Sequence, residues 1–285
     1  MTSGLDWRGR VGDVWAAEWR RTDRSLADLS RHLNAAIAAV APEQGLALDI
    51  GSGAGATSLA LHAVRPGLRV TGVDLSPDLV TVAQGRAADE GGGADEAHLR
   101  FRRDDAIQWA AREGPFDLFV SRHGVMFFPD PVAAFKGFRQ AATDDAAFIF
   151  SCFDERGHNG FATLADAVIG HTPPTPAGYE PGPFAFADSH RVADWLEQAG
   201  WVPGAAARLS FEYVVGAGDD PVADAVAFLS RIGPAARAIG GATPDERDRI
   251  VEALGRALSD YRVEDRVVLP ASAWIWRAHA RGGVG

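Results

Sequence analysis

The stretch LALDIGSGAGATSLAL, residues 46–61, decides the fold of this chain. A short apolar run passes through an acid, three glycines then alternate with small residues, and helical spacing begins at residue 56. A strand, a glycine turn and a helix in this order favour a nucleotide ligand. Glycines let the backbone approach the ligand closely, and the start of the helix offers free N–H groups.

The alternation of strands and helices continues from this stretch to residue 153. Apolar runs predict further strands at 69–76, 99–106, 116–122 and 146–153. Helical spacing lies between them at 56–64, after Pro77, where Ser76 is a candidate N-cap, and at 131–141. Continuous apolar strands at βαβ spacing are typical of a parallel sheet that is covered on both faces. We therefore predict an α/β fold, a doubly wound Rossmann-like sheet with helices on both faces.

The flanking segments are less regular. One long helix is predicted over 14–40, a loop over 85–98, and a Pro- and Gly-rich lid over 171–190 between short helices at 160–170 and 190–199. Strands at 208–215 and 272–279 enclose a helical stretch at 221–262, which Gly233-Pro234 and Gly240-Gly241 interrupt. The chain is thus divided into a cap (1–44), a cofactor-binding core (45–153), a lid and substrate region (154–208) and C-terminal strands with a helical insertion (209–285).

The composition limits which partners and which cellular compartment can be expected. The net charge of −10, from 28 Lys+Arg against 38 Asp+Glu, argues against a nucleic-acid partner. The single cysteine, Cys152, excludes an intrachain disulfide and a Cys-based zinc site, and no H-x-x-x-H or H-x-H pair supports another metal. No apolar run reaches the roughly 18–20 residues that span a bilayer, and the N-terminus has no apolar signal core. We expect a cytoplasmic protein without a membrane partner, and a homodimer stays open.

Acids on both sides of the glycines discriminate between two cofactors. Asp74 ends the second strand, 23 positions after Gly51, where a carboxylate can accept hydrogen bonds from ribose hydroxyls. Gly51, Gly53 and Ala56 also satisfy a relaxed dinucleotide fingerprint, so an NAD(P)-dependent oxidoreductase remains an alternative. Asp49, two residues before the first glycine, would repel a pyrophosphate but attract a cationic amino-acid ligand.

These motifs resemble those of class I S-adenosylmethionine-dependent methyltransferases. LDIGSGAG is similar to the first motif of that family, VTGVDLSP to the second and FRRDDA to the third. The resemblance implies S-adenosylmethionine as the cofactor and S-adenosylhomocysteine as the product. It places several residues around them: Gly51, Ser52, Gly53 and Ser121 at the methionine part, Asp74 at the ribose, Leu75, Asp105 and Ala106 at the adenine, and Trp15 and Trp19 as a cover. Asp104 competes with its neighbour Asp105 for the adenine role.

A second resemblance concerns the acceptor side. SRHGVMFFPDP, residues 121–131, and PGPFAFAD, residues 181–188, are similar to motifs of a bacterial small-molecule subgroup with S-R-F-G-V-M-F-F-x-D-P. This chain has His123 where that subgroup usually has phenylalanine. It also has AATDDAAFIF, residues 141–150, in place of an R-P-G-G turn, a change that we expect to affect only a loop.

His123 is the candidate catalytic residue. It follows the fourth strand at the edge where ligands bind in open α/β sheets, and its ordinary pKa of about 6.5 suits a base. It could equally line the pocket without moving a proton. A base would help an acceptor that has a hydroxyl or amine group, which is the acceptor we expect. Nearby phenylalanines would make the pocket apolar and suit a hydrophobic or aromatic small molecule, although core packing explains at least half of them equally well (Phe127, Phe128, Phe184 and Phe186). A non-catalytic protein that keeps the cofactor pocket is the remaining alternative.

Overall fold

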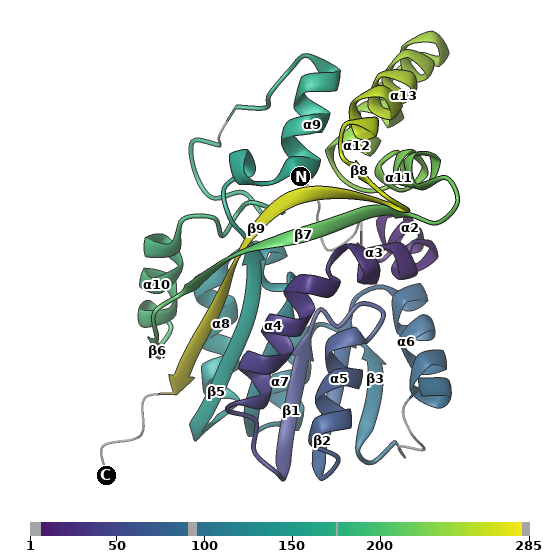
Figure 1. The fold of residues 1–285 in the computed structure, drawn as a ribbon. Coiled ribbons are helices and arrows are strands. Elements are labelled where there is room, and N and C mark those ends of the chain that lie inside the picture. The colour runs from purple at the N-terminus through teal and green to yellow at the C-terminus, as the bar shows by residue number, and fades with distance from the viewer. Residues whose placement is uncertain (1–6, 91–95, 175, 281–285) are drawn as a thin grey trace.

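The computed structural model describes residues 7–90, 96–174 and 176–280 (Figure 1). Within these residues nine strands form one sheet in the order β3-β2-β1-β4-β5-β9-β6, and β7 and β8 pair with β9. The strands are β1 (Gly45–Ile50), β2 (Leu68–Asp74), β3 (Leu99–Arg103), β4 (Phe116–Arg122), β5 (Ala142–Phe153), β6 (Trp201–Pro203), β7 (Ala207–Ala217), β8 (Arg262–Val263) and β9 (Arg266–Ala280).

The predicted doubly wound sheet is confirmed. Strands β1 to β5 are parallel, and β1 lies between β2 and β4, so the strand order reverses at the carboxyl ends of β1 and β4. Ligands bind at this reversal in open α/β sheets. Helices cover both faces, with α4 (Ala27–Ala38) and α5 (Ala56–Val64) in front of the sheet in Figure 1 and α7 (Ala106–Glu113) and α8 (Pro131–Gln140) behind it.

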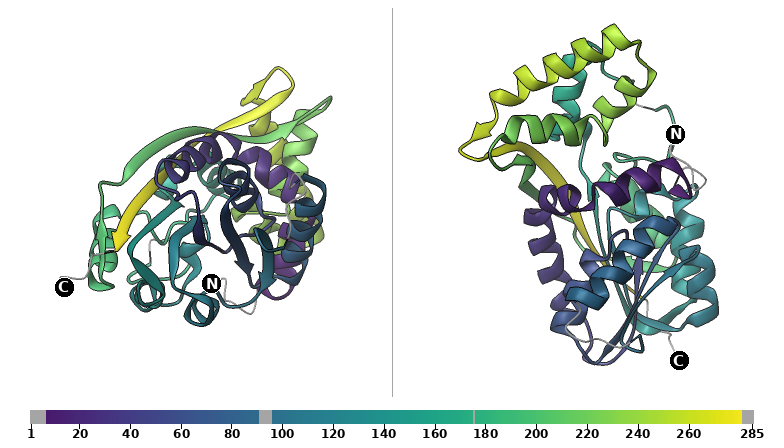
Figure 2. Two further views of the ribbon diagram at one scale, coloured as in Figure 1. Left: turned by 90° about the horizontal axis from the view of Figure 1, so that it is seen from below. Right: turned by 90° about the vertical axis from the view of Figure 1, so that its right-hand side faces the viewer.

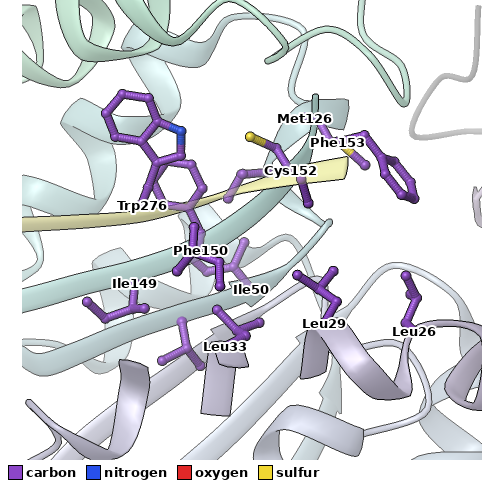
Figure 3. Close-up of a cluster of buried hydrophobic side chains, with 14 of the residues drawn as sticks. Leu26, Leu29, Leu33, Ile50, Met126, Ile149, Phe150, Cys152, Phe153 and Trp276 are labelled. Atoms are coloured by element: carbon purple, nitrogen blue, oxygen red, sulfur yellow. The ribbon is translucent and has the colours of Figure 1, made fainter. Parts of the chain in front are cut away.

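Apolar side chains fill both spaces between helices and sheet. Leu29 and Leu33 of α4 face Ile50 and Ile149 in one layer (Figure 3). The other layer holds a cluster of tilted and edge-on aromatic rings from β4, β5, α8 and β6, with centroids 5.4 to 6.0 Å apart (Phe119, Phe135, Phe138, Phe148 and Trp201). Such contacts fix the sheet that carries the site.

The N-terminal segment differs from its prediction. The expected single helix is three helices, α2 (Arg10–Ala17), α3 (Trp19–Ser25) and α4, with breaks at Glu18 and Leu26. Neither break has a proline or glycine. The three helices instead pack against different partners: α2 against α6 (Pro77–Glu90), α3 against β7, and α4 against the sheet and α5. Tertiary contacts therefore override a continuous apolar pattern.

Two boundaries also differ. Helix α6 extends to Glu90, so residues 85–90 of the loop expected over 85–98 are helical, and residues 91–95 lie outside the described part. Strand β5 begins at Ala142 because that residue pairs with Phe116 across an irregularity in the ladder. Ser76 caps α6 as predicted, since its Oγ accepts a hydrogen bond from the Leu79 amide (3.2 Å).

A second layer of helices stands over the carboxyl edge of the sheet (Figures 1 and 2). It consists of α9 (Gly160–Ile169), α11 (Pro221–Leu229), α12 (Pro234–Gly241) and α13 (Pro244–Ser259). The breaks between the last three helices lie near the two glycine-containing pairs at which the sequence predicts them. We call these four helices the upper layer. The segment from α11 to α13 leaves the sheet after β7 and returns at β9, and its two ends meet where Gly218 N–H donates to the Asp265 carbonyl (3.0 Å).

Helix α10 (Ser189–Gln198) packs against α8 and β6 at the far edge of the sheet. Among the described helices, none combines the length and the apolar character needed to cross a membrane.

Candidate functional site

The glycine turn after β1 has a backbone that other residues would strain. Gly51 and Gly53 have φ of +63° and +54°, in the left-handed region that favours glycine. A Cβ at Gly51 would lie 3.1 Å from Gly124 Cα, whereas a Cβ at Gly53 would meet no atom within 4 Å. The turn is thus packed on its β4 side and open at Gly53. The Ser52 Cβ instead lies close to Gly72 in β2, so the Ser52 side chain points toward the sheet.

Asp74 joins the end of β2 to this turn. Its Oδ2 accepts a hydrogen bond from Gly53 N–H and its Oδ1 accepts one from Ser76 N–H, both at 2.9 Å. Burial raises the pKa of Asp74, while these two hydrogen bonds lower it. The Leu75 backbone also hydrogen-bonds this carboxylate, which has about four acceptor positions, so its own backbone partners do not fill all of them.

Asp49 lies beneath the turn and is 1% exposed. Its Oδ2 accepts a hydrogen bond of 2.6 Å from Ser58 Oγ at the start of α5. Burial raises the pKa of Asp49 to about 6, although the Ser58 hydrogen bond and the positive charge of Arg122 both lower it. The nearby positive charge thus does not fully offset the burial of this carboxylate.

A pocket of about 230 Å³ adjoins Asp74 beyond the ends of β2 and β3. It is lined by residues of three segments that are far apart in the sequence (Arg8, Leu75, Arg103, Asp104, Asp105 and Gln108). Asp105 caps α7, since its Oδ1 accepts hydrogen bonds from the amides of Ile107 and Gln108. Asp104 pairs with Arg112. Both acids line the pocket, so the structure leaves the competition between them open.

The end of β4 is tied to the glycine turn. Ser121 Oγ donates to the Ile50 carbonyl (2.7 Å) and accepts from Gly124 N–H (3.1 Å). Ser121 is fully buried, so its hydroxyl holds two backbone segments together at the methionine end of the expected site.

His123 lies beyond Ser121 in an unusual backbone conformation. Its φ is +63°, uncommon for a residue with a side chain, although histidine adopts this region more often than most. Nδ1 lies 2.8 Å from Ser151 Oγ, the ring packs edge-on against Phe153, and Nε2 has no hydrogen-bond partner among the described residues. Burial, and then the charge of Arg122, lower the pKa of His123 to about 3, so the ring is neutral at pH 7.

Comparison with known proteins decides the identity of the core. The family model described as "Methyltransferase domain" matches residues 48–150. This match covers the glycine turn, Asp74, Asp105 and the strand ends described above. Residues 48–150 are a class I methyltransferase domain. S-adenosylmethionine is the cofactor of this domain.

Curated relatives match over less than a third of the chain. An uncharacterised protein of Mycobacterium tuberculosis is 34% identical over 87 residues, which are 30% of this chain and 29% of the relative. A release factor glutamine methyltransferase of Chlorobaculum tepidum is 40% identical over 77 residues, 26% of this chain and 25% of the relative. The chain thus spans less than a third of the length of these relatives.

Solved structures with a similar fold cover more of this chain than residues 48–150. The YcgJ protein of Bacillus subtilis matches with a TM-score of 0.53 at 18% identity, covering 89% of this chain and 100% of that one. A magnesium protoporphyrin IX methyltransferase from Synechocystis, solved with bound S-adenosylhomocysteine, matches with a TM-score of 0.50 at 16% identity, covering 88% and 82%. At these identities the likeness concerns the fold.

The residues of the methyltransferase domain fit its cofactor in three respects. Space is open beside Gly53. Asp74 retains acceptor positions next to that space. The pocket beyond Asp74 has an apolar wall at Leu75 and a carboxylate at Asp105. These features suit a ligand with an amino-acid part, a ribose and an adenine, in that order.

The N-terminal helices cover this domain, and α2 approaches it closely. A Cβ at Gly12 would lie 2.5 Å from Ser76 Oγ and 2.4 Å from the Trp7 carbonyl, so α2 rests on the residue that follows Asp74 and Leu75. Trp15 contacts Trp7, which in turn contacts Phe127.

Trp19 packs away from the pocket. Its ring lies between the guanidinium groups of Arg20 and Arg86, at 4.4 and 4.3 Å. It also packs against the cluster formed by Ala16, Ala54 and Leu79, and its role as a cover for the cofactor stays a prediction.

Gly12→Ala is expected to weaken cofactor binding although alanine favours a helix. The added methyl collides with Ser76 and the Trp7 carbonyl, which costs about 1–3 kcal/mol and displaces α2. Gly85→Ala in α6 is the matched control, because a Cβ there meets nothing within 4 Å and should stabilise the fold by about 0.5–1 kcal/mol. Calorimetric titration with S-adenosylhomocysteine and thermal melts measure both effects. Equal affinities in the two variants would contradict this account.

Binding is also expected to depend on pH through Asp49. The ligand's ammonium group favours the ionised carboxylate, so binding lowers a pKa that is about 6 in the free protein. Affinity should be constant above about pH 7 and fall by up to about tenfold per unit below pH 6, with proton release on binding. Titrations in buffers of different ionisation enthalpy measure that release. Asp49→Asn should abolish it, and an unchanged profile in this variant would exclude Asp49 as the source.

Proposed function

We propose that this chain transfers the methyl group of S-adenosylmethionine to a hydroxyl or amine of a small molecule. The observation that carries the proposal is His123. A buried histidine, whose Nε2 finds no hydrogen-bond partner in the described part of the chain, stands at the end of β4, beside the turn that carries the cofactor motif. Buried polar atoms are rarely left without a partner, and a group that meets a ligand is one explanation.

On the cofactor side we assign contacts from the geometry of each residue. The backbone of Gly51, Ser52 and Gly53 would pass beneath the methionine part, since the Ser52 side chain points elsewhere. Asp74 would hold the ribose. Leu75 and Ala106 would flank the adenine and Asp105 would accept from its amino group, while Asp49 and Ser121 would act from beneath the turn.

The acceptor side is aromatic. Phe153 contacts the His123 ring, and Phe161 and Phe184 stack on each other at 6.0 Å next to Phe153. Tyr213 packs on Phe161 at 5.0 Å. A flat, apolar acceptor with one polar group suits such walls.

Two of the phenylalanines expected to line the acceptor pocket belong to the core instead. Phe128 packs on Phe138, and Phe186 packs on Phe135 and Phe150. The two subgroup motifs nevertheless meet, because Gly182 N–H donates to the Met126 carbonyl at 3.0 Å and Tyr179 Oη to the Phe128 carbonyl at 2.5 Å.

The residues of the chain itself then have two tasks: they orient the acceptor, and they take one proton from it. The bound cofactor supplies an electrophilic methyl group on its sulfonium sulfur. After the transfer this sulfur is a neutral thioether. A neutral His123 whose Nδ1–H donates to Ser151 keeps its Nε2 lone pair for the acceptor's O–H or N–H. Nε2 orients the acceptor and takes its proton as the new bond to carbon forms. Because the pKa of His123 is low, we expect the proton to move only after the bond between the acceptor and the methyl carbon has largely formed.

Two measurements test the proposal in sequence. Calorimetric titration should show S-adenosylhomocysteine binding and no NAD(H) binding; the reverse result would overturn the methyltransferase in favour of an oxidoreductase. Methyl-labelled S-adenosylmethionine is then incubated with phenols, catechols and amines, while release of S-adenosylhomocysteine is followed. Turnover on protein substrates alone would overturn the small-molecule acceptor.

A further inference from the structure

Helix α3 lies between the methyltransferase domain and the upper layer (Figures 1 and 2). Charged residues in and directly before this helix make two sets of contacts. Glu18, directly before the helix, is followed by Arg21 and Arg24 at intervals of three, which places them on one face. Asp23 belongs to the other set. The two sets bind different parts of the molecule.

The first set holds the root of the upper layer. Arg21 and Arg24 pair with the two oxygens of Asp224 in α11, each at 2.7 Å. Glu18 pairs with Arg231, which follows α11, at 3.0 Å. The Glu18 side chain is 3% exposed, so this carboxylate depends on its cationic partners.

The second set holds the cofactor site. Asp23 Oδ2 pairs with Arg86 of α6 at 2.8 Å, and Arg86 also donates to the Ala54 carbonyl in the glycine turn at 2.9 Å. Asp23 Oδ1 pairs at 2.7 Å with Arg122, the neighbour of His123. One carboxylate therefore bridges the glycine turn and the end of β4, and both arginines are largely buried.

The upper layer is itself connected. Helix α11 packs against α13 and α12, and both of these pack against α9. Phe228 and Leu229 of α11 and Leu254 and Leu258 of α13 are buried in this layer. A displacement of α11 should therefore be shared by the other helices of the upper layer, including α9, which carries Phe161.

We propose that α3 couples the cofactor site to the upper layer, so that a bound cofactor holds the acceptor side closed. The Glu18 carboxylate and the guanidinium groups of Arg86 and Arg122 are largely buried, so separating either set of contacts costs free energy. While both sets are intact, α3 therefore moves together with the cofactor site and with α11. A ligand that stabilises the glycine turn and α2 then stabilises the closed layer as well. The inference rests on the proposed function, which places the acceptor under this layer.

Hydrogen exchange with and without saturating S-adenosylhomocysteine tests the coupling. In the unaltered chain the ligand should slow exchange of amides in α11 and α13 by about fivefold or more. In Asp224→Asn the ligand should still slow exchange in the glycine turn and α3, but no longer in α11 and α13. Arg231→Gln cuts the other contact of the first set and should reduce the transmitted protection too, which keeps the test valid if Asp224→Asn does not fold.

Glu252→Gln is the matched control. It removes an exposed ion pair with Arg256 within α13 that does not involve α3, so the transmitted protection should stay intact. Unchanged exchange in α11 and α13 of the unaltered chain, or full protection in both Asp224→Asn and Arg231→Gln, would overturn the coupling while leaving the proposed function standing. Absence of any calorimetric signal for S-adenosylhomocysteine would overturn the proposed function, and the coupling with it.

Discussion

His123→Phe is expected to lower turnover by about 10²-fold, the lower end of the range for general acid–base catalysis. The lower end applies because the low pKa of His123 makes it a weak base. Affinity for S-adenosylhomocysteine should change little, since none of the cofactor contacts assigned above uses the imidazole. Initial rates with the best acceptor, set beside calorimetric affinities, separate the two effects.

Two further substitutions distinguish a proton acceptor from a pocket wall. His123→Asn keeps a polar side chain that tolerates the left-handed backbone, but it has no titratable nitrogen. Ser151→Ala removes the partner of Nδ1 and leaves the imidazole free to change tautomer. Turnover should fall in both variants if Nε2 takes the proton. Full activity in His123→Phe would assign the residue to the pocket wall.

Asp74→Ala is expected to weaken cofactor binding by about 1–3 kcal/mol, which corresponds to roughly 5- to 150-fold in Kd. The substitution removes the carboxylate that we assign to the ribose, and it also releases the Gly53 and Ser76 amides. Calorimetric titration measures the change directly.

Asp117→Ala is the matched control for Asp74→Ala. Asp117 also accepts a backbone hydrogen bond, from Leu46 N–H at 2.8 Å, but at the opposite end of the sheet. It should lower stability and leave Kd unchanged. Equal losses of affinity in both variants would mean that Asp74 acts only through the stability of the sheet.

The parallel core could be predicted because its signals are local. Strands β1, β2 and β4 and the second half of β5 are largely apolar runs bounded by turn residues, β3 alternates apolar and charged residues, and α5 has the limits that its spacing indicates. The breaks at Glu18 and Leu26 could not be predicted, because they follow from what each helix packs against. The three-residue β6 is too short to leave a periodic pattern, and it forms because β9 offers an open edge.

The site divides in the same way. Asp74, Asp105 and His123 could be found from the sequence because the ends of parallel strands meet at one edge. Arg86 and Asp23 could not, since their roles come from contacts between residues 63 positions apart. The left-handed backbone of His123 could not be predicted either. It goes with the close packing of the next residue, Gly124, against Gly51 in the glycine turn, and that contact is seen only in the structure.

The hydrogen bond between Gly218 and Asp265 brings together the two ends of the α11–α13 segment, so this segment can be regarded as a replaceable insertion, or cassette. Its two ends adjoin, so a chain of different length or shape could replace it while β7 and β9 keep their pairing. Substrate preference could then diverge without any change to the glycine turn. A transplanted cassette would still need an acid where Asp224 stands and a base where Arg231 stands, so interchange is restricted to segments that carry the same two charges.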